Sequence, residues 1–495
     1  MFRNVSPESV GVKSENVLEY IKYLERRGIV MHSIIMMRGN DIFAEYYYKP
    51  FDKDFVHRQY SQTKSYVSVA IGLLEEEGKL KLSDTIASHF PERIDKELSP
   101  FLKEQTIEDM LKMETAASYP NWFTSGDPDR VHMYFNNGAG LHPSGTLWWY
   151  DSTGSHVLGA LVEKLTGKNL LDYLKEKLFN KMGTFSTAEI LKTPNGEAWG
   201  DSALLCTPRD MLSFARFVMN YGTWENERLM NEAYLRKATS KLSDNNLEGF
   251  TACDSHGYGY QIWRTEQNGF AFLGMGGQDT VCVPEKDIIL VYNGDNQGYP
   301  EARNITMNGF FDIIVNNLSD SKLHENKEAE KRLQEATENL SLAYLKNGVE
   351  SSFKNEVNGK VFLAKENPMG IKKFALVFTS EDEGVFKYEN RQGEKEIKFG
   401  IGKNVFGKFP ELGYSNEIGG VRTTNGFMYN CAASLIFSEE KKIKLKVQII
   451  DKYFGNFTAT FAYKNNSCAV RMIKTAEDFL EKYHGELYSE WEEII

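Results

Sequence analysis

Hydrophobic and polar residues follow two different periods along this chain. Apolar residues at intervals of three and four predict helices over residues 14–27, 106–112, 155–165, 169–178, 211–220 and 305–317. Shorter apolar runs bounded by turn residues predict strands over residues 32–38, 42–48, 259–263, 279–283 and 287–292. The first two strands flank a Gly-Asn-Asp turn and form a predicted hairpin. Residues 121–140 are rich in aromatic, glycine, aspartate and asparagine residues, which predicts a loop that could line a cleft.

The order of these elements predicts two domains. A hairpin, a helical insertion and then further strands are typical of a layered α+β domain, which we place at residues 1–318. Residues 319–344 begin with a charged, helix-forming stretch and are interpreted as a helical linker. Alternating strands with Gly, Asn and Pro turns then predict a β-rich accessory domain over residues 345–495, with a closing helix at 474–483. The chain length of 495 residues also favours two domains, because it exceeds one ordinary hydrophobic core.

A serine followed three residues later by a lysine opens a predicted buried helix. The apolar positions of this helix are Val67, Ala70, Ile71 and Leu74. Ser61 at the helix start places a backbone N–H where it can face an oxyanion, and Lys64 lies one turn later on the same face. A serine hydroxyl needs a base to become a nucleophile, and a lysine kept neutral by its surroundings can serve. The same spacing begins at Ser319, Ser351 and Ser438, where a solvated serine near a surface lysine is the better interpretation.

Two further segments carry candidate chemistry. Tyr150 follows a Pro-Ser-Gly-Thr turn and precedes an apolar helix, so its phenol could relay the serine proton, first as base and then as acid. The alternative for Tyr150 is an aromatic core residue with a satisfied hydroxyl. Residues 274–278, Gly-Met-Gly-Gly-Gln, allow close backbone approach, and the Met275 N–H could pair with that of Ser61 as a second oxyanion donor. The alternative here is a glycine-rich bend in an ordinary strand.

Composition narrows the classes of function. The chain is 41% hydrophobic and 26% charged, an ordinary composition for a soluble domain, and its net charge of −11 disfavours a nucleic-acid partner. No apolar run reaches the length of a membrane-spanning helix, and the N-terminus has no apolar signal core, so we expect a cytoplasmic protein. The five cysteines form no Cys-x-x-Cys pair, which indicates neither a disulfide framework nor a zinc site. The sequence thus implies no metal and no cofactor.

Taken together in their order, these segments resemble the class C β-lactamase-like serine hydrolases of the serine β-lactamase and penicillin-binding-protein superfamily. The resemblance covers residues 5–318 and implies a β-lactamase/DD-peptidase-like antiparallel sheet with flanking helices and a helical subdomain, followed by a mostly β domain. It implies that Ser61 is the acylated nucleophile, Lys64 its activating partner and Tyr150 the general base and acid. Ser152 stands where the family most often has asparagine, and Met275 supplies the second oxyanion donor. Asp151, beside Tyr150, is expected to be a solvated loop carboxylate.

The resemblance also bears on the substrate. Residues 272–274, Phe-Leu-Gly, stand where β-lactamases and many peptidases of the superfamily have Lys-Thr-Gly or His-x-Gly, whose cation would hold a substrate carboxylate. The Gly-x-Gly-Gly-Gln form is more similar to the esterase and amide-hydrolase branches. The expected substrate-binding residues are Phe272, Leu273, Gly274, Gly276, Gly277, Gln278 and Trp149. Core packing accounts equally well for Trp149 and for its neighbours Trp122, Phe123 and Trp148.

The leading hypothesis is therefore a serine hydrolase that cleaves a small-molecule or peptide ester or amide through an acyl-enzyme, with no nucleic-acid or membrane partner. A penicillin-recognising D,D-peptidase or β-lactamase is an alternative within the same fold. A catalytically inactive binding module is an alternative of another class, against which the intact Ser61, Lys64 and Tyr150 argue. A carbohydrate- or peptide-binding role for the C-terminal domain stays open.

Overall fold

The protein divides into two compact units. The structure, a computed structural model, describes residues 2–116, 126–246, 252–419 and 423–491. The first unit comprises Met1–Ser341 with Glu417–Val421, and the second comprises Leu342–Asn416 with Arg422–Ile495. The division after Ser341 lies beyond the predicted domain end at 318, since the charged helix α13 (Lys327–Thr337) buries Leu333 in a core of the first unit.

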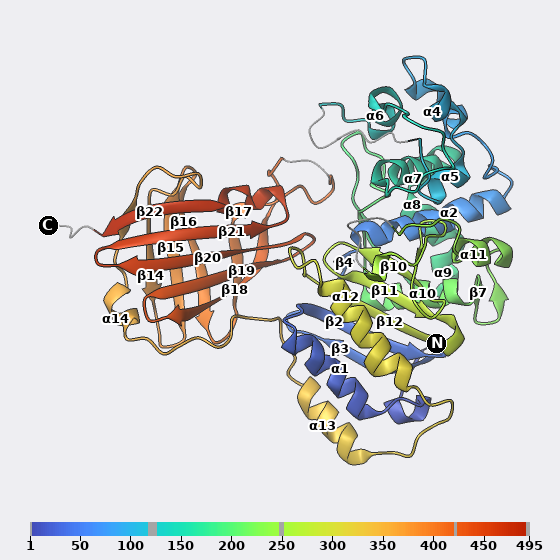
Figure 1. The fold of residues 1–495 in the computed structure, drawn as a ribbon. Helices are drawn as coiled ribbons and strands as arrows, with labels where there is room; N and C mark the ends of the chain where they lie inside the picture. The colour runs from blue at the N-terminus through green and yellow to red at the C-terminus, as the bar shows by residue number, and fades with distance from the viewer. Residues whose placement is uncertain (1, 117–125, 247–251, 420–422, 492–495) are drawn as a thin grey trace. The chain divides into compact units, whose positions relative to one another are not determined.

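A seven-stranded sheet forms the centre of the first unit (Figure 1). Its order is β1 (Arg3–Asn4), β3 (Asp41–Tyr47), β2 (Met31–Arg38), β12 (Ile288–Gly294), β11 (Gln278–Val283), β10 (Phe270–Gly274) and β9 (Trp263–Arg264). The pairings are antiparallel except for β1 with β3. The predicted hairpin of β2 and β3 thus joins strands from the far end of the domain, which confirms the predicted α+β fold.

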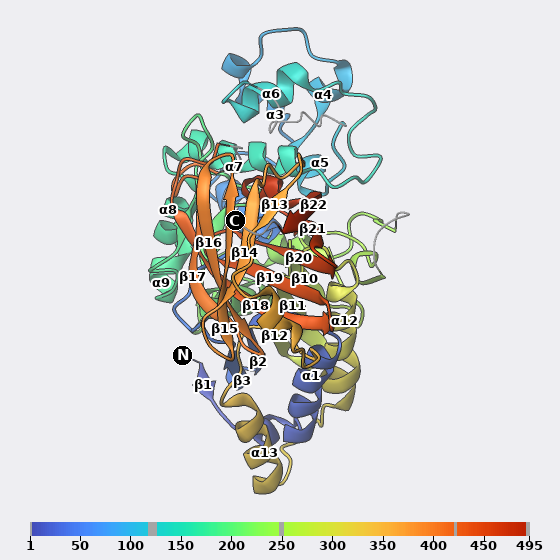
Figure 2. The same cartoon turned by 90° about the vertical axis from the view of Figure 1, so that its left-hand side faces the viewer.

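Helices cover both faces of this sheet (Figures 1 and 2). On one face, α1 (Ser14–Arg26) and α12 (Ala302–Gly309) share a core with Met36 and Leu290. On the other face, α2 (Thr63–Glu76) and α10 (Pro208–Met219) share a core with Met37 and Ile289. Neighbouring strand residues enter different cores because successive side chains point to opposite faces.

The helical region lies between β3 and β9 in the sequence. It contains α3 (Ile86–His89), α4 (Pro100–Glu104), α5 (Ile107–Leu111), α6 (Arg130–Asn137), α7 (Ser152–Thr166), α8 (Leu170–Leu174), α9 (Asn180–Met182) and α11 (Glu232–Ala238). Two short sheets accompany these helices: β4 (His57–Arg58), β6 (Leu204–Cys206) and β5 (Glu189–Ile190), and the hairpin of β7 (Thr223–Trp224) with β8 (Glu227–Arg228). This region corresponds to the expected helical subdomain.

The predicted loop at 121–140 is wrong where it overlaps α6. The Asp129 side chain accepts a hydrogen bond from the His132 N–H and caps this helix, and Val131 and Phe135 are buried beneath it. The apolar face of α6 is short and has polar residues at both ends, so the sequence pattern did not predict a helix there. Trp122 and Phe123 lie outside the described residues.

The second unit is a β-barrel. Its ten strands follow the order β16 (Gly393–Ile401), β15 (Glu383–Asn390), β14 (Lys373–Phe378), β13 (Phe362–Ala364), β22 (Gly485–Trp491), β21 (Ser467–Thr475), β20 (Phe454–Lys464), β19 (Lys442–Ile450), β18 (Met428–Glu439) and β17 (Val405–Leu412). A parallel pairing of β16 with β18 closes the sheet. Phe457, Ala459 and Phe461 alternate with threonines along β20 and are buried, as a barrel interior requires. One short helix, α14 (Phe353–Val357), precedes the strands.

The predicted closing helix at 474–483 is wrong. β21 continues to Thr475, and a 3₁₀ segment, Asp478–Tyr483, then connects it to β22. The helical spacing of Phe479, Leu480 and Tyr483 reflects this short turn, in which all three side chains are buried. Pairing of β21 with strands on both sides outweighs the local helix preference.

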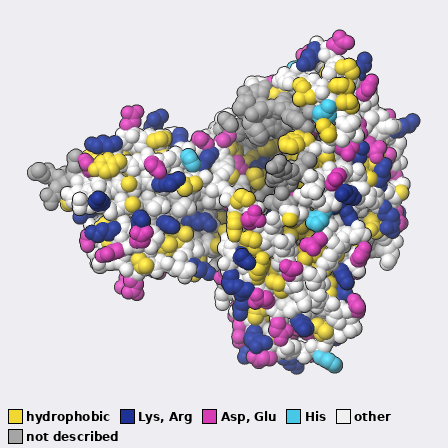
Figure 3. Space-filling view, viewed as in Figure 1, with side chains coloured by type: hydrophobic (Ala, Val, Ile, Leu, Met, Phe, Trp, Pro, Cys, Tyr) yellow, Lys and Arg dark blue, Asp and Glu magenta, His cyan; other side chains and the backbone are white. Residues whose placement is uncertain are grey.

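Acidic and basic side chains are interspersed on the surface, as Figure 3 shows for one face. A single large basic field is absent from the part of the surface drawn there, in keeping with the net charge of −11. Among the described residues, no helix combines the length and the apolar character that a membrane crossing requires.

Two buried histidines, His32 and His57, lie close together in the first unit. Their ring centroids are 5.5 Å apart, and His32 stacks on Phe51. Burial lowers the pKa of His57 to about 3 and also lowers the pKa of His32, which the neighbouring His57 depresses further. Both rings therefore stay neutral in the folded protein at pH values at which they are protonated in the unfolded chain.

We expect the free energy of unfolding to fall as the pH drops below about 6.5, because only the unfolded chain then binds these protons. Each histidine contributes a slope of about 1.4 kcal/mol per pH unit down to its folded pKa. Urea unfolding between neutral and mildly acidic pH measures this slope. His57→Gln should remove about half of the histidine contribution, whereas the exposed His324 should contribute nothing, so His324→Gln is the control. Equal slopes for wild type and His57→Gln would contradict the expectation.

Candidate active site

Ser61 lies in a strained turn at the start of α2. The 3₁₀ turn Tyr60–Gln62 leads directly into the helix, and Tyr60 adopts a φ of 47°, a left-handed conformation that is unusual for a tyrosine. The guanidinium of Arg58 holds the Tyr60 ring at 4.3 Å and also lies 4.6 Å from the ring of Trp199. Strain of this kind persists only when the surroundings enforce it, and it is concentrated at functional sites.

Lys64 links Ser61 to two other segments. Its Nζ donates to Ser61 Oγ at 3.0 Å and to the carbonyl oxygen of Asp201 at 2.9 Å, and it lies 4.0 Å from the Asp201 carboxylate. It also lies 5.0 Å from the ring centroid of Tyr150. The Lys64 residue is only 1% exposed. A buried amine needs partners to offset its lost hydration, and these contacts supply them.

Tyr150 is positioned by aromatic packing and by the helix that follows it. Its ring stacks on Trp263 at 5.5 Å, and Trp148 lies 6.5 Å away. Asp151 caps α7 by accepting the Gly154 N–H at 2.9 Å. The structure therefore brings Ser61, Lys64 and Tyr150 together, although they come from two segments far apart in the sequence.

The residues after Tyr150 differ from the prediction. Asp151 is buried, and burial raises its pKa, so the expected solvated loop carboxylate is wrong. Ser152 is the first residue of α7 and is half-buried. Among the described residues, no hydrogen bond joins the Ser152 hydroxyl to Ser61, Lys64 or Tyr150.

The end of β10 approaches the turn that carries Ser61. A Cβ at Gly274 would lie 2.2 Å from the carbonyl oxygen of Gln59, so only glycine allows the two backbones to come this close. Gly276 and Gly277 have φ values of 81° and 95° and form the turn into β11. This arrangement places the Met275 peptide close to the segment that contains Ser61, while the Met275 side chain is 45% exposed.

Other predicted binding residues have structural roles. Phe272 is buried and packs on Phe214 at 5.2 Å, and Leu273 is buried in the core on the opposite face. The Gln278 side chain donates to the carbonyl oxygen of Gly294 at 2.5 Å and accepts from Asn293 at 3.0 Å. These three side chains pack within the sheet or bond to its neighbouring strand. A contact between a substrate and β10, or the first residue of β11, would therefore involve the backbone.

The Trp149 side chain is exposed on the surface, and the backbone N–H of Trp149 donates to the Met113 carbonyl oxygen. Sequence reasoning missed Asp201, which contacts Lys64, as well as Asp279 and Arg303, which contact Gly274. Only Asp279 had a sequence signal, because it directly follows the glycine-rich segment.

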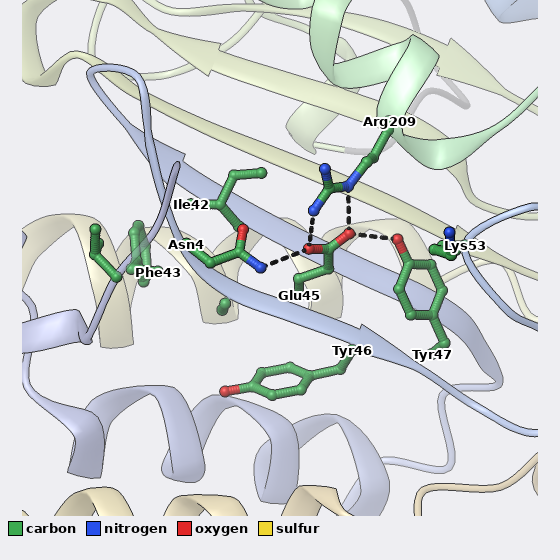
Figure 4. Close-up of a pocket in the computed structure, with 10 residues that line it drawn as sticks. Asn4, Ile42, Phe43, Glu45, Tyr46, Tyr47, Lys53 and Arg209 are labelled. Carbon is green, nitrogen blue, oxygen red and sulfur yellow. Dashed lines mark hydrogen bonds and ion pairs between the residues drawn. The ribbon is translucent and has the colours of Figure 1, made fainter. Parts of the chain in front are cut away.

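A separate pocket of about 390 Å³ lies along β3 (Figure 4). The Arg209 guanidinium donates to both carboxylate oxygens of Glu45 at 2.7 and 2.6 Å, and Tyr47 donates to the same carboxylate at 2.7 Å. The principal charges in this pocket thus pair with one another.

Among the residues that the structure describes, no group of three His, Cys, Asp or Glu side chains is arranged to hold a metal ion.

Comparison with known proteins identifies relatives of this chain. The family model described as Beta-lactamase matches residues 20–306. The 6-aminohexanoate-dimer hydrolase of Paenarthrobacter ureafaciens is 24% identical over 279 residues, covering 52% of this chain and 71% of that protein.

Solved structures also match. A Bacillus anthracis protein named after the same hydrolase has a TM-score of 0.52 and 17% identity, over 63% of this chain and 87% of its own. The octameric penicillin-binding protein homologue of Pyrococcus abyssi has a TM-score of 0.49 and 16% identity, over 96% of this chain and 99% of its own. At 17% identity, the likeness to the Bacillus anthracis structure shows a shared fold and nothing further.

Proposed function

The chain belongs to the beta-lactamase family, and from this premise we propose that it is a serine hydrolase that cleaves an ester or amide bond through an acyl-enzyme on Ser61. The observation that carries the proposal is the 3.0 Å contact between Lys64 Nζ and Ser61 Oγ, in a strained turn beside Tyr150. A nucleophile within hydrogen-bond reach of a proton-handling group is the arrangement that covalent catalysis needs.

In the proposed reaction, Ser61 Oγ attacks the substrate carbonyl carbon, and its proton passes to Tyr150, which accepts it in the phenolate form and becomes a neutral phenol. Lys64 Nζ, 3.0 Å from Ser61 Oγ and 5.0 Å from the Tyr150 ring centroid, orients the nucleophile beside this base. The N–H groups of Ser61 and Met275 stabilise the oxyanion. Collapse of the tetrahedral intermediate breaks the bond to the leaving group, which takes the proton from Tyr150. Water then attacks the acyl-enzyme and regenerates Ser61.

The proposed substrates are small esters or amides that need no cation at residue 272. The phenylalanine there is buried in the core and offers no charge to a substrate carboxylate. The Paenarthrobacter relative is named for hydrolysis of the 6-aminohexanoate dimer, in which an amide bond joins two amino acids. We therefore include this amide among the substrates to be tested.

The test is intact-protein mass after treatment with a fluorophosphonate and, separately, with penicillin, together with hydrolysis of p-nitrophenyl esters and of the linear 6-aminohexanoate dimer. We expect a single fluorophosphonate adduct, turnover of an ester or the amide, and no stable penicillin adduct. Stable acylation by penicillin would favour the D,D-peptidase alternative. A folded protein that forms no adduct would overturn the proposal and favour an inactive binding module.

A further inference from the structure

Both backbone groups of Gly274 are held by side chains from other elements. Its N–H donates to Asp279 Oδ1 at 2.9 Å, and its carbonyl oxygen accepts from Arg303 Nη2 at 3.0 Å. Asp279 lies on β11 and Arg303 near the start of α12. The last residue of β10 is thus fixed by the next strand and by a helix on one face of the sheet.

Asp279 and Arg303 are themselves part of a connected network. The Arg303 guanidinium contacts the Asp279 carboxylate at 3.0 and 3.3 Å, and Tyr292 donates to Asp279 at 2.5 Å. Arg303 also lies 3.7 Å from Asp254. Asp279 is fully buried, so its carboxylate depends on these partners. Such a network holds its members in one arrangement, because loss of one partner would leave a charge without a partner in the low-dielectric interior.

The orientation of one peptide unit connects this network to the candidate site. The carbonyl of Gly274 and the N–H of Met275 belong to the same planar trans peptide, so they point in opposite directions. A carbonyl directed at Arg303 therefore turns the Met275 N–H away from α12. The same carbonyl oxygen also accepts the Gly277 N–H at 3.3 Å, a longer contact made within the flexible glycine turn itself. Outside the turn, the orientation is set by Arg303, which binds the carbonyl, and by Asp279, which holds Arg303 and the Gly274 N–H in place.

We propose that Arg303 and Asp279 are positioning residues that hold the peptide between Gly274 and Met275 with its N–H directed at the Ser61 oxyanion. This role rests on the proposed function, because it concerns the same oxyanion. A peptide free to rotate would lose one of the two donors.

A different role for Arg303 would be direct capture of a substrate anion. Its side chain is 26% exposed and lines a small pocket of about 100 Å³ with Gly276 and Gly277. Two carboxylates, Asp279 and Asp254, already face the guanidinium. Their charge offsets that of Arg303, which favours the positioning role over anion capture.

The experiment compares the rate of fluorophosphonate labelling, and kcat and KM on an ester, in wild type, Arg303→Met, Arg303→Lys and Asp279→Asn. We expect Arg303→Met to lower the labelling rate and kcat by about 10²–10³-fold, the usual effect of losing one oxyanion donor, with KM nearly unchanged. Arg303→Lys should be faster than Arg303→Met, because an ammonium can still donate to either the Gly274 carbonyl oxygen or the Asp279 carboxylate. Anion capture would instead raise KM for anionic esters alone.

Arg216→Met is the matched control, since Arg216 also pairs with an aspartate, Asp287, and lies on α10. Wild-type protein without a Ser61 adduct would refute the proposed function and this role with it. A labelled wild type and a folded Arg303→Met labelled at the same rate would overturn the positioning role alone. If Arg303→Met does not fold, Arg303→Lys decides: a rate below that of wild type supports the role, and an equal rate overturns it.

Discussion

Replacing Ser61 by alanine is expected to lower kcat/KM by about 10⁴–10⁶-fold and to abolish the fluorophosphonate adduct. The acyl-enzyme requires an oxygen at this position, and alanine removes it without adding volume. The change removes one of the hydrogen bonds of Lys64, while the bond to the Asp201 carbonyl oxygen remains. We therefore expect a loss of stability of only about 1 kcal/mol. Ester hydrolysis and intact-protein mass measure the chemical effect, and thermal unfolding verifies the fold.

Ser351→Ala is the matched control for this variant. Ser351 also precedes a lysine by three residues, but it is near the surface and its hydroxyl donates to the Glu440 carbonyl oxygen. Labelling and turnover should match those of wild type. Persistence of the adduct in Ser61→Ala would show that another residue is the nucleophile.

Replacing Lys64 by methionine is expected to lower the rate of acylation by about 10³-fold or more. Methionine fills much of the volume of the lysine stem, but it cannot donate to Ser61 Oγ or take part in proton transfer. Lys64 also lies 4.0 Å from the buried Asp201 carboxylate, so the variant should lose stability as well. Single-turnover acylation, measured on the folded fraction, separates the two effects.

Lys354→Met provides the comparison. Lys354 lies in the second unit and follows Ser351 by three residues, as Lys64 follows Ser61. Its ammonium donates to the backbone carbonyl oxygens of Ser380 and Glu381. Acylation should be unchanged there. If Lys64→Met were acylated as fast as wild type, Lys64 would have no part in activating the nucleophile, and Tyr150 alone would have to account for it.

The parts of the site that were predictable from sequence are those that depend on local geometry. Ser61 and Lys64 lie one helical turn apart, so a helix starting at the serine brings the two side chains together wherever it lies in the fold. The glycines at 274–277 likewise indicated a close backbone approach. In the structure, the Gly274 backbone lies so close to the Gln59 carbonyl oxygen that a side chain at 274 would not fit. The pairing of these segments with Tyr150 came from their resemblance to a known family.

Side-chain direction on the central sheet was not predictable. Phe272, Leu273 and Gln278 lie on strands whose two faces are both covered by helices, so the sequence alternation that would separate an inner from an outer face is missing. All three were predicted to contact substrate, and in the structure their side chains pack in the core or bond to β12.

The sequence by itself determined the α+β character of the first unit, the β character of the second and the local Ser61–Lys64 arrangement, because these follow from residue periodicity and short spacing. Only the tertiary structure showed Asp201 beside Lys64, or Arg303 and Asp279 holding Gly274. Each of these is a single polar residue with no motif around it. Its partner is fixed by strand pairing and helix packing, which bring together residues as far apart as 64 and 201 and which local preferences do not encode.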